Sequence, residues 1–304
     1  MTKADPLERL LVAVMGEAKS TKTSFALTFP KPMVDFDLDQ SFERCEARFR
    51  ALYPDAKILK LPPGAELLDG HMAAFDLIVR QYRLPITLPG RAPTGMKELW
   101  DDHIINEIVR ADENPRIKTC MIDTGTVLWE VNRMAHLQRT NDRSEKERER
   151  LISIEYARPN TEARSLLSAA RFTSTNLIVT HHVKGKYGPG MVENKRGEME
   201  LKQDQLIGET LDGYKETNAI VDITARVRSE ITCEHENVTF IDNEAGRAQH
   251  GAHKINETPV PALVINECGY ALSAQGKKIT TPSFDSLLAL VNERRDADAE
   301  LATL

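Results

Sequence analysis

The sequence predicts an α/β protein with a mainly parallel central sheet flanked by helices and extended by antiparallel hairpins toward the C-terminus. Apolar, strand-length runs rich in branched residues recur along the chain, and helix-length stretches separate several of them. Strands that alternate with helices indicate crossover units and hence parallel strands buried on both faces. The predicted strands cover residues 10–15, 33–38, 117–122, 176–180, 220–227, 238–241 and 262–265. The predicted helices cover residues 23–28, 96–110, 126–136 and 162–172.

The 304 residues suit one large α/β domain with extensions. We expect this domain to cover residues 1–275, followed by a helical C-terminal tail over 276–304. Prolines punctuate residues 54–95, which predicts an insertion of loops and short helices. The late apolar runs follow one another without long helices, so they predict hairpins. The dense charges of residues 139–150 are typical of a solvated helix or a mobile loop.

Composition excludes several classes of protein. No apolar run approaches the length that spans a bilayer, and 28% of the residues are charged, so we expect no membrane partner. The first residues mix charges with apolar side chains and lack a signal-peptide cleavage site, which predicts a cytoplasmic address. Four well-separated cysteines without a CxxC pair favour reduced thiols. The net charge of -6 argues against general coating by nucleic acid but allows a local basic loop.

The first apolar run leads into a segment that is typical of a phosphate-binding loop. The spacing from Gly16 to Lys22 and Thr23 matches the pattern GxxxxGK[ST], between a strand and a helix-like segment. In such a loop, backbone N–H groups and the helix N-terminus bind phosphates, Lys22 reaches the β and γ phosphates, and the Thr23 hydroxyl serves Mg²⁺. The candidate nucleotide-binding residues are Gly16, Glu17, Ala18, Lys19, Ser20, Thr21, Lys22, Thr23 and Ser24.

One position departs from the phosphate-loop pattern. Thr21 stands where the second glycine is expected, so either its backbone is strained or the loop curls differently. This residue puts tight hydrolysis in doubt. The alternative reading of the whole segment is a helix N-terminus that Ser and Thr merely cap, with Lys22 a surface charge.

Acidic residues end two other predicted strands. Asp123 follows the run at 117–122, where a carboxylate could hold Mg²⁺ and its water shell; the alternative is a cap for the next helix. Asp37 and Asp39 end the run at 33–38, and the period of two places them on the same side. One of them could activate the attacking water, but alternation with Asp35 also fits a solvated face.

The run at 176–180 ends in His181 and His182, and a polar side chain there could touch the γ phosphate and respond to its loss. The Gly-rich segment that follows predicts a mobile, basic loop able to contact a phosphodiester backbone and stack on bases. A flexible surface loop without this role remains an alternative. The candidate DNA-binding residues are Lys184, Lys186, Tyr187, Lys195 and Arg196.

A metal-ligating group of a different kind would combine cysteine and histidine. Paired histidines at 181 and 182 lack a clear third ligand. The spacing of Cys233, His235, His250 and His253 does not match a standard zinc site, so zinc is the weaker interpretation.

Together, the segments GEAKSTKTS, MVDFDLD, CMIDTGT and LIVTHHVKGKYG resemble, in this order, the motifs of RecA-like ATP-binding proteins of bacteriophages and prophages, including proposed single-strand annealing recombinases. The likeness runs from about residue 10 to about residue 247. It implies nucleotide contacts at Lys22 and Thr23, and a Mg²⁺ role for Asp123. It also implies a water-activating role for Asp39 before Asp37, and a phosphate-sensing role for His182 before His181.

The resemblance further implies a RecA-like P-loop NTPase fold, ATP and Mg²⁺ as cofactors, and single-stranded DNA as partner. Histidine replaces the usual amide at the sensing position, which leaves the coupling to DNA open. Related ATPases place basic residues that reach a neighbouring subunit where FIDNEAGR stands, and only Arg247 could serve here. We expect a homo-oligomer, a phage single-strand-binding protein as a further partner, and the host bacterial cytoplasm if the chain is phage-encoded.

Three functions fit these patterns. The first is a Mg²⁺-dependent ATPase of phage-type DNA recombination, repair or replication. The second is a small-molecule kinase, which needs an arginine-rich lid; the insertion offers only Arg80, Arg83 and Arg91. The third is an interaction module that binds nucleotide without hydrolysing it.

Overall fold

The computed structural model describes residues 7, 9–31, 33–39, 45, 51, 58–61, 118–172, 175–193, 199–236, 239–241, 248–250 and 254–301. Its centre is an eight-stranded sheet in the order β12-β11-β8-β1-β5-β4-β2-β3. The strands from β8 to β3 pair in parallel, and β11 and β12 add an antiparallel edge. The strands are β1 (Leu11–Met15), β2 (Met33–Asp37), β3 (Ile58–Leu61), β4 (Thr119–Asp123), β5 (Asn176–His181), β8 (Ile223–Glu236), β11 (Lys254–Cys268) and β12 (Lys278–Ile279).

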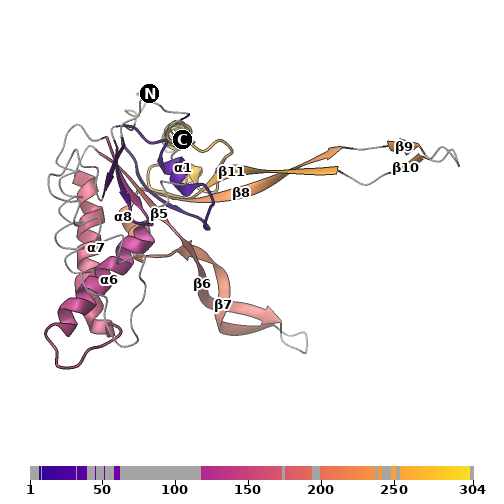
Figure 1. The fold of residues 1–304 in the computed structure, drawn as a ribbon. Helices are drawn as coiled ribbons and strands as arrows, with labels where there is room; N and C mark the ends of the chain where they lie inside the picture. Colours follow the sequence, from indigo (N-terminus) through magenta and orange to yellow (C-terminus); the bar gives the residue numbers. More distant parts are fainter. Residues whose placement is uncertain are drawn as a thin grey trace.

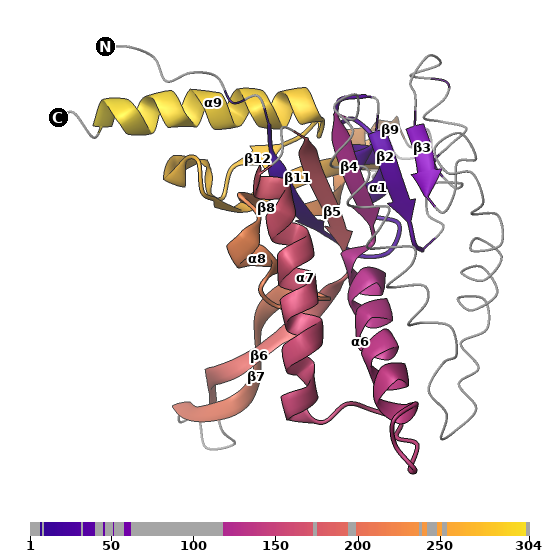
Figure 2. The same cartoon turned by 90° about the vertical axis from the view of Figure 1, so that its left-hand side faces the viewer.

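Helices cover both faces of this sheet (Figures 1 and 2). Alternate residues of β1 enter different cores: Leu11 and Ala13 face α6 (Gly125–Asn141) and α7 (Ala157–Ala169), whereas Val12 and Val14 face the other side. This alternation follows from the period of two in a strand and explains why the buried strands read as continuous apolar runs.

The second face is covered by α1 (Lys22–Ala26) and α9 (Phe284–Leu301). The rings of Phe29, which follows α1, and Phe284 lie with their centroids 4.9 Å apart, and both side chains are buried. The predicted C-terminal tail therefore contains a helix that helps to bury the same face of the sheet as α1. The domain boundary at residue 275 stays a prediction.

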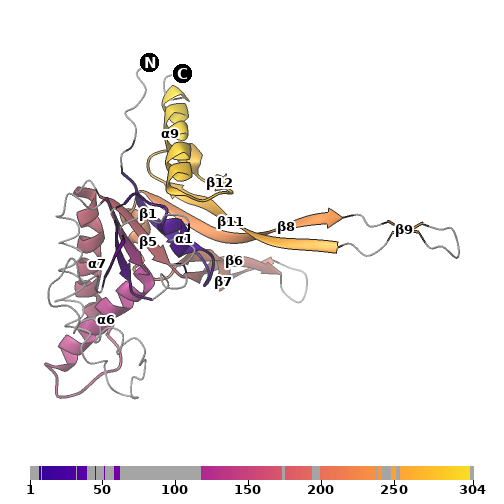
Figure 3. The ribbon, with the colours of Figure 1, turned by 45° about the horizontal axis from the view of Figure 1, so that its top comes forward.

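Two antiparallel extensions leave the body on the same side (Figures 1 and 3). The β6–β7 ribbon consists of β6 (Val183–Glu193) and β7 (Met199–Leu211). The β8–β11 arm is the outer part of β8 and β11, and β9 (Thr239–Ile241) pairs with β10 (Ala248–His250) beyond it. The predicted late hairpins are confirmed. Short helical turns complete the order: α8 (Thr217–Ile220), η2 (Ser153–Tyr156), η3 (Ala170–Phe172) and η4 (Leu272–Ala274).

The structure corrects several sequence predictions. The Gly-rich segment after β5 is not a loop: its residues 183–193 form β6, because they pair with the segment 199–211 that follows. Within the predicted insertion, residues 58–61 form β3 and pair with β2; the rest of residues 54–95 and the predicted helix at 96–110 lie outside the described residues. The charged run after α6 is largely exposed, as predicted for a solvated segment. Among the described residues, no helix is both long and apolar enough to span a bilayer.

Candidate functional site

The loop after β1 has the tight geometry that a phosphate-binding loop requires. A Cβ atom on Gly16 would lie 2.4 Å from Ser20 Oγ and 2.8 Å from the Val227 carbonyl oxygen, so only glycine fits there. Gly16 N–H donates to the His181 carbonyl at 3.2 Å, which ties the start of the loop to the end of β5. The loop therefore leaves the sheet at the carboxyl edge of its central strands.

Lys22 is buried under this loop. Its Nζ donates to the carbonyl oxygens of Gly16 at 3.0 Å and Glu17 at 2.7 Å, and its side chain is only 7% exposed. A surface lysine would instead extend into water. The interpretation of Lys22 as a mere surface charge is therefore wrong, and its ammonium group is held where phosphates would meet the loop.

Thr21 takes up the left-handed backbone conformation that the missing glycine would favour. Its φ and ψ are 69° and 18°, and Lys19 also has a positive φ of 64°. The loop thus keeps its curl and accepts a strained β-branched residue, which decides between the two alternatives that the sequence left open. The helix that follows is shorter than predicted, since α1 ends at Ala26.

The acid at the end of β4 contacts the residue after Lys22. Thr23 Oγ1 donates to Asp123 Oδ2 at 2.7 Å, and Thr180 Oγ1 donates to the other carboxylate oxygen. Asp123 is 1% exposed. Thr124, not Asp123, caps α6, because its side chain accepts the Val127 N–H at 3.2 Å. The cap interpretation of Asp123 is therefore wrong, and the carboxylate bridges β4 to the phosphate loop.

Two further carboxylates approach Asp123. β2 and β4 pair with Asp37 opposite Asp123, and ligand oxygens of Asp37, Asp39 and Asp123 lie within 4.8 Å of one another. Asp37 and Asp39 are half-buried and Asp35 is fully buried, so the alternative prediction of a solvated face is wrong. Hard oxygen donors of this kind, together with the Thr23 hydroxyl, suit Mg²⁺, which prefers carboxylates and retained waters. The donor set fits the predicted metal.

The two histidines at the end of β5 have different surroundings. His181 is 1% exposed and its Nδ1 lies 2.9 Å from the Asp212 carbonyl oxygen, whereas its Nε2 has no partner in the structure. A Cβ atom on Gly125 would lie 2.5 Å from the ring, so the ring is enclosed. Burial lowers the pKa of His181 from 6.5 to about 4, against the opposing effect of the Asp212 carbonyl. His181 is thus a neutral interior side chain.

Thr180 is the strand-end residue that sequence reasoning missed. Alternation along β5 places Thr180 and His182 on one side and His181 on the other. Thr180 contacts Asp123, and His182 is half-buried with its backbone N–H bonded to Thr126 Oγ1 at 3.0 Å. The sequence signal for Thr180 is the alternation of side chains along β5, which places it on the same side as His182.

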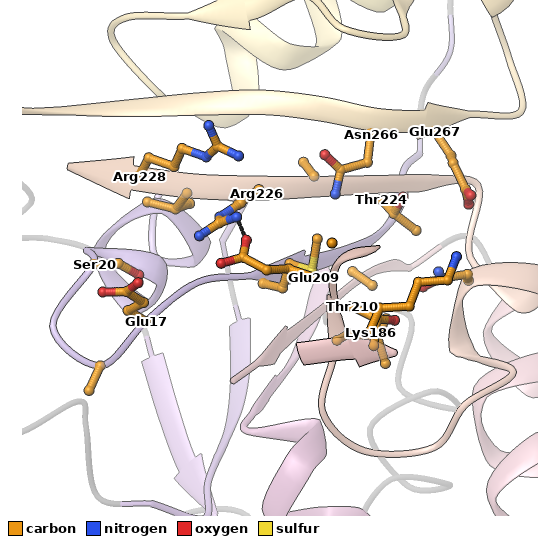
Figure 4. A pocket seen from close by; sticks show the side chains of 18 of the residues that line it. Glu17, Ser20, Lys186, Glu209, Thr210, Thr224, Arg226, Arg228, Asn266 and Glu267 are labelled. Carbon is orange, nitrogen blue, oxygen red and sulfur yellow. Dashed lines mark ion pairs between the residues drawn. The ribbon is translucent and has the colours of Figure 1, made fainter. Parts of the chain in front are cut away.

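A cavity of about 850 Å³ adjoins the outer flank of the phosphate loop (Figure 4). It lies between the loop, the β6–β7 ribbon and β8. Arg226 and Arg228 line it from β8, Lys186 and Glu209 line it from the ribbon, and Arg226 forms an ion pair with Glu209. Burial lowers the pKa of Arg226, and the nearby Arg228 lowers it further, while Glu17 acts in the opposite direction.

Arg226 and Arg228 were not singled out from the sequence. Their signal is the alternation of Arg226 and Arg228 with the apolar Ala225 and Val227, which places both arginines on one face. A second, more apolar cavity of about 450 Å³ lies on the other flank of the loop, beside Thr21 and Ser24. The phosphate loop therefore has space on both flanks.

Other predicted site residues lie apart or outside the described residues. Lys184 pairs with Asp212 at 3.1 Å, and Tyr187 is 66% exposed on the ribbon. Several other predicted residues have side chains outside the described part of the structure: Lys195, Arg196, Cys233, His235, Arg247, His250, His253, Arg80, Arg83 and Arg91. The zinc, lid and subunit-bridging interpretations therefore remain sequence predictions.

The fold is an α/β fold with a mainly parallel central sheet and an antiparallel edge. Its loop, acid and strand-end residue lie on three strands, with β5 between β1 and β4. No family model and no curated protein matches the chain. Solved structures similar to it include the KaiC-like protein PH0186 from the hyperthermophilic archaeon Pyrococcus horikoshii, at 13% identity and a TM-score of 0.36. Another is the RadB recombinase, at 10% identity and a TM-score of 0.40; each match covers 88% of this chain and 84% of the other. Sequence identities and TM-scores this low carry no argument about function, so the function has to be argued from the site of this chain.

The strain at Thr21 predicts a reversal of the usual ranking of alanine and glycine. Left-handed backbone costs a residue with a Cβ atom about 1–2 kcal/mol, which exceeds the entropic cost of glycine. Thr21→Gly should therefore be more stable than Thr21→Ala by up to about 1 kcal/mol. At the exposed helical control Thr161, glycine should be less stable than alanine by about 1 kcal/mol. Chemical denaturation measures all four variants; the same ranking at both positions would contradict the strain.

The buried His181 predicts a pH dependence of stability. Its folded pKa of about 4 lies below the usual 6.5, so the unfolded state binds the proton more readily. Its contribution is present above pH 6.5 and is lost as the pH falls toward 4, by on the order of a few kcal/mol. Denaturation across this range should show a steeper fall for the wild type than for His181→Gln. Parallel curves for the two proteins would argue against a buried neutral ring.

Proposed function

We propose that the chain is a Mg²⁺-dependent ATPase of the RecA-like kind that binds single-stranded DNA in phage-type recombination, repair or replication, as a homo-oligomer. The observation that carries this proposal is the contact between Thr23 and Asp123 directly after the buried Lys22. A buried ammonium group and a buried carboxylate are both costly to bury, so their presence supports the binding of a charged ligand such as a nucleotide.

The residues of the site divide the chemistry among them. Lys22 would exchange its bonds to the loop carbonyls for the β and γ phosphates, and those bonds hold its charge in place without nucleotide. Thr23 and Asp123 would hold Mg²⁺, which neutralises charge on phosphate oxygens when it is bound. Asp39, with Asp37 as its neighbour, accepts the proton of the attacking water. His182 follows Thr180 on the same side of β5 and senses the γ phosphate.

The nucleobase fits the apolar cavity beside Thr21 and Ser24. Phe25, Val260 and Pro282 line this cavity, together with several hydroxyl groups. Such a lining suits a flat aromatic ring with few fixed polar contacts. The Mg²⁺ and phosphate end of ATP would then lie at Lys22, Thr23 and Asp123.

The β6–β7 ribbon supports the proposed contact with single-stranded DNA. Tyr187 and Leu206 are paired across the ribbon, both are more than 60% exposed, and both lie over Gly185, where a Cβ atom would come within 2.9 Å of each. Lys186, the preceding residue of β6, is exposed and lines the cavity beside the phosphate loop. An exposed aromatic ring can stack on bases, and an exposed lysine can pair with the backbone. Lys184 contributes less, because Asp212 partly neutralises it.

Steady-state ATP hydrolysis, measured with and without single-stranded DNA, tests the proposal. We expect hydrolysis that DNA stimulates and that Lys22→Ala lowers by at least about 100-fold, because the variant loses the charge that stabilises the transferred phosphoryl group. Lys118→Ala is the matched control: this exposed lysine lies before β4, at the opposite edge of the sheet. Tyr187→Ala should lower the stimulation by DNA and leave turnover without DNA unchanged.

Each part of the proposal can fail separately. Equal rates for Lys22→Ala and Lys118→Ala would refute the catalytic assignment. Hydrolysis that ignores DNA and the Tyr187 variant would refute the recombination half. Turnover of a small-molecule acceptor would indicate the kinase, and ATP binding without hydrolysis would indicate the interaction module.

A further inference from the structure

The β6–β7 ribbon leaves the body and returns to it at the same point, so its two ends, the start of β6 and the end of β7, lie together. β6 begins one residue after His182, and β7 ends one residue before Asp212. Asp212 N–H donates to the His182 carbonyl oxygen at 2.7 Å, so the two ends are bonded to each other. The base of the ribbon is therefore closed, and the ribbon moves with these two residues.

A single hydroxyl group bonds both ends. Thr126 Oγ1 donates to the Asp212 carbonyl oxygen at 2.6 Å and accepts the His182 N–H at 3.0 Å. Thr126 lies in the first turn of α6, three residues after Asp123. The hydroxyl thus joins the segment that follows the metal-site acid to both ends of the ribbon.

The space around this hydroxyl group is tightly filled. His181 Nδ1 lies 2.9 Å from the Asp212 carbonyl oxygen, which also accepts from Thr126. Neighbouring glycines leave no room for a side chain: a Cβ atom on Gly125 would lie 2.5 Å from the His181 ring, and one on Gly213 would lie 3.0 Å from Nδ1. Close-packed interiors transmit displacements and do not absorb them. A shift of residues 123–126 must therefore move the base of the ribbon.

Nucleotide binding would supply such a shift. Asp123 now accepts hydrogen bonds from Thr23 and Thr180. Ligation of Mg²⁺ by the Thr23 hydroxyl and the Asp123 carboxylate would replace the bond between them, because both oxygens then turn toward the ion. The carboxylate and the peptide groups that follow it would adjust together.

We infer that Thr126 is a positioning residue that couples the state of the nucleotide site to the position of the β6–β7 ribbon. This inference rests on the proposed function, and it adds a specific route: Asp123, then Thr126, then both ends of the ribbon. A route through His182 would reach Asp212 only by way of the hydrogen bond between them, whereas Thr126 bonds both residues directly. The bonds of Thr126 to both ends make the ribbon respond as a unit.

Amide hydrogen exchange of residues 183–193 and 199–211 tests the inference. It is measured with and without Mg²⁺ and a non-hydrolysable ATP analogue. In the wild type, nucleotide should change the exchange of these amides by about threefold or more. Thr126→Val, which keeps the shape but removes the hydroxyl, should lose this response while binding the analogue normally. Thr126→Ser, which keeps the hydroxyl, should restore it.

A kinetic readout accompanies the exchange measurement. In Thr126→Val, stimulation of hydrolysis by single-stranded DNA should be lost, whereas kcat without DNA stays within about twofold of the wild type. If Thr126→Val folds poorly, Thr126→Ala removes the same hydroxyl without a methyl group near Asp212 and should give the same loss.

The outcomes separate this inference from the proposed function. A ribbon that responds to nucleotide equally in the wild type and in the folded hydroxyl-less variants would overturn the inference. So would a wild-type ribbon that ignores bound nucleotide. Failure of the wild type to bind the analogue at all would instead refute the proposed function, and with it the state that Thr126 is inferred to transmit.

Discussion

The hydrogen bond from Thr23 to Asp123 is the contact on which the site depends. It joins the phosphate loop to the end of β4 across a buried gap, and Thr180 of β5 bonds the second oxygen of the same carboxylate. The start of α1 and the ends of β4 and β5 are thereby held together at the carboxyl edge of the sheet. The buried ammonium group of Lys22 lies one residue from this contact, and the loop carbonyls satisfy its protons. A buried cation at Lys22 and a buried anion at Asp123 are what the proposed binding of charged phosphates and their metal requires.

The same contact explains the arrangement of the moving parts. β5 lies between β1 and β4, and the β6–β7 ribbon continues from its end, so the residues that touch Asp123 are adjacent to those that anchor the ribbon. On the outer flank of the loop, the Arg226–Glu209 ion pair connects the ribbon to β8 and is a second link between the ribbon and the body. The ribbon is thus anchored close to the nucleotide site from two directions, which suits an ATPase whose activity responds to a bound polymer.

Much of the site could be predicted because it follows local rules. The loop spacing predicts Lys22 and Thr23, and the position after a buried strand predicts Asp123; the structure places Thr23 in contact with Asp123. The rest depends on pairing between distant segments. The sequence predicts a loop where the structure has β6, because glycines interrupt the strand pattern there. Its partner β7 is a separate, later segment. Thr180 contacts Asp123, and Thr126 contacts Asp212, although each pair lies far apart in the sequence. These contacts depend on the strand order, which the local sequence does not predict. His181, one residue from the sensing position, belongs to the interior because of strand alternation.

The most direct test of the central contact is the Mg²⁺ dependence of ATP binding, measured by calorimetry for the wild type and Asp123→Asn. If Thr23 and Asp123 hold the metal of bound ATP, Mg²⁺ should strengthen binding to the wild type by about tenfold or more and strengthen binding to the variant far less. Equal effects of Mg²⁺ on the two proteins, or no binding of ATP by the folded wild type, would contradict the account.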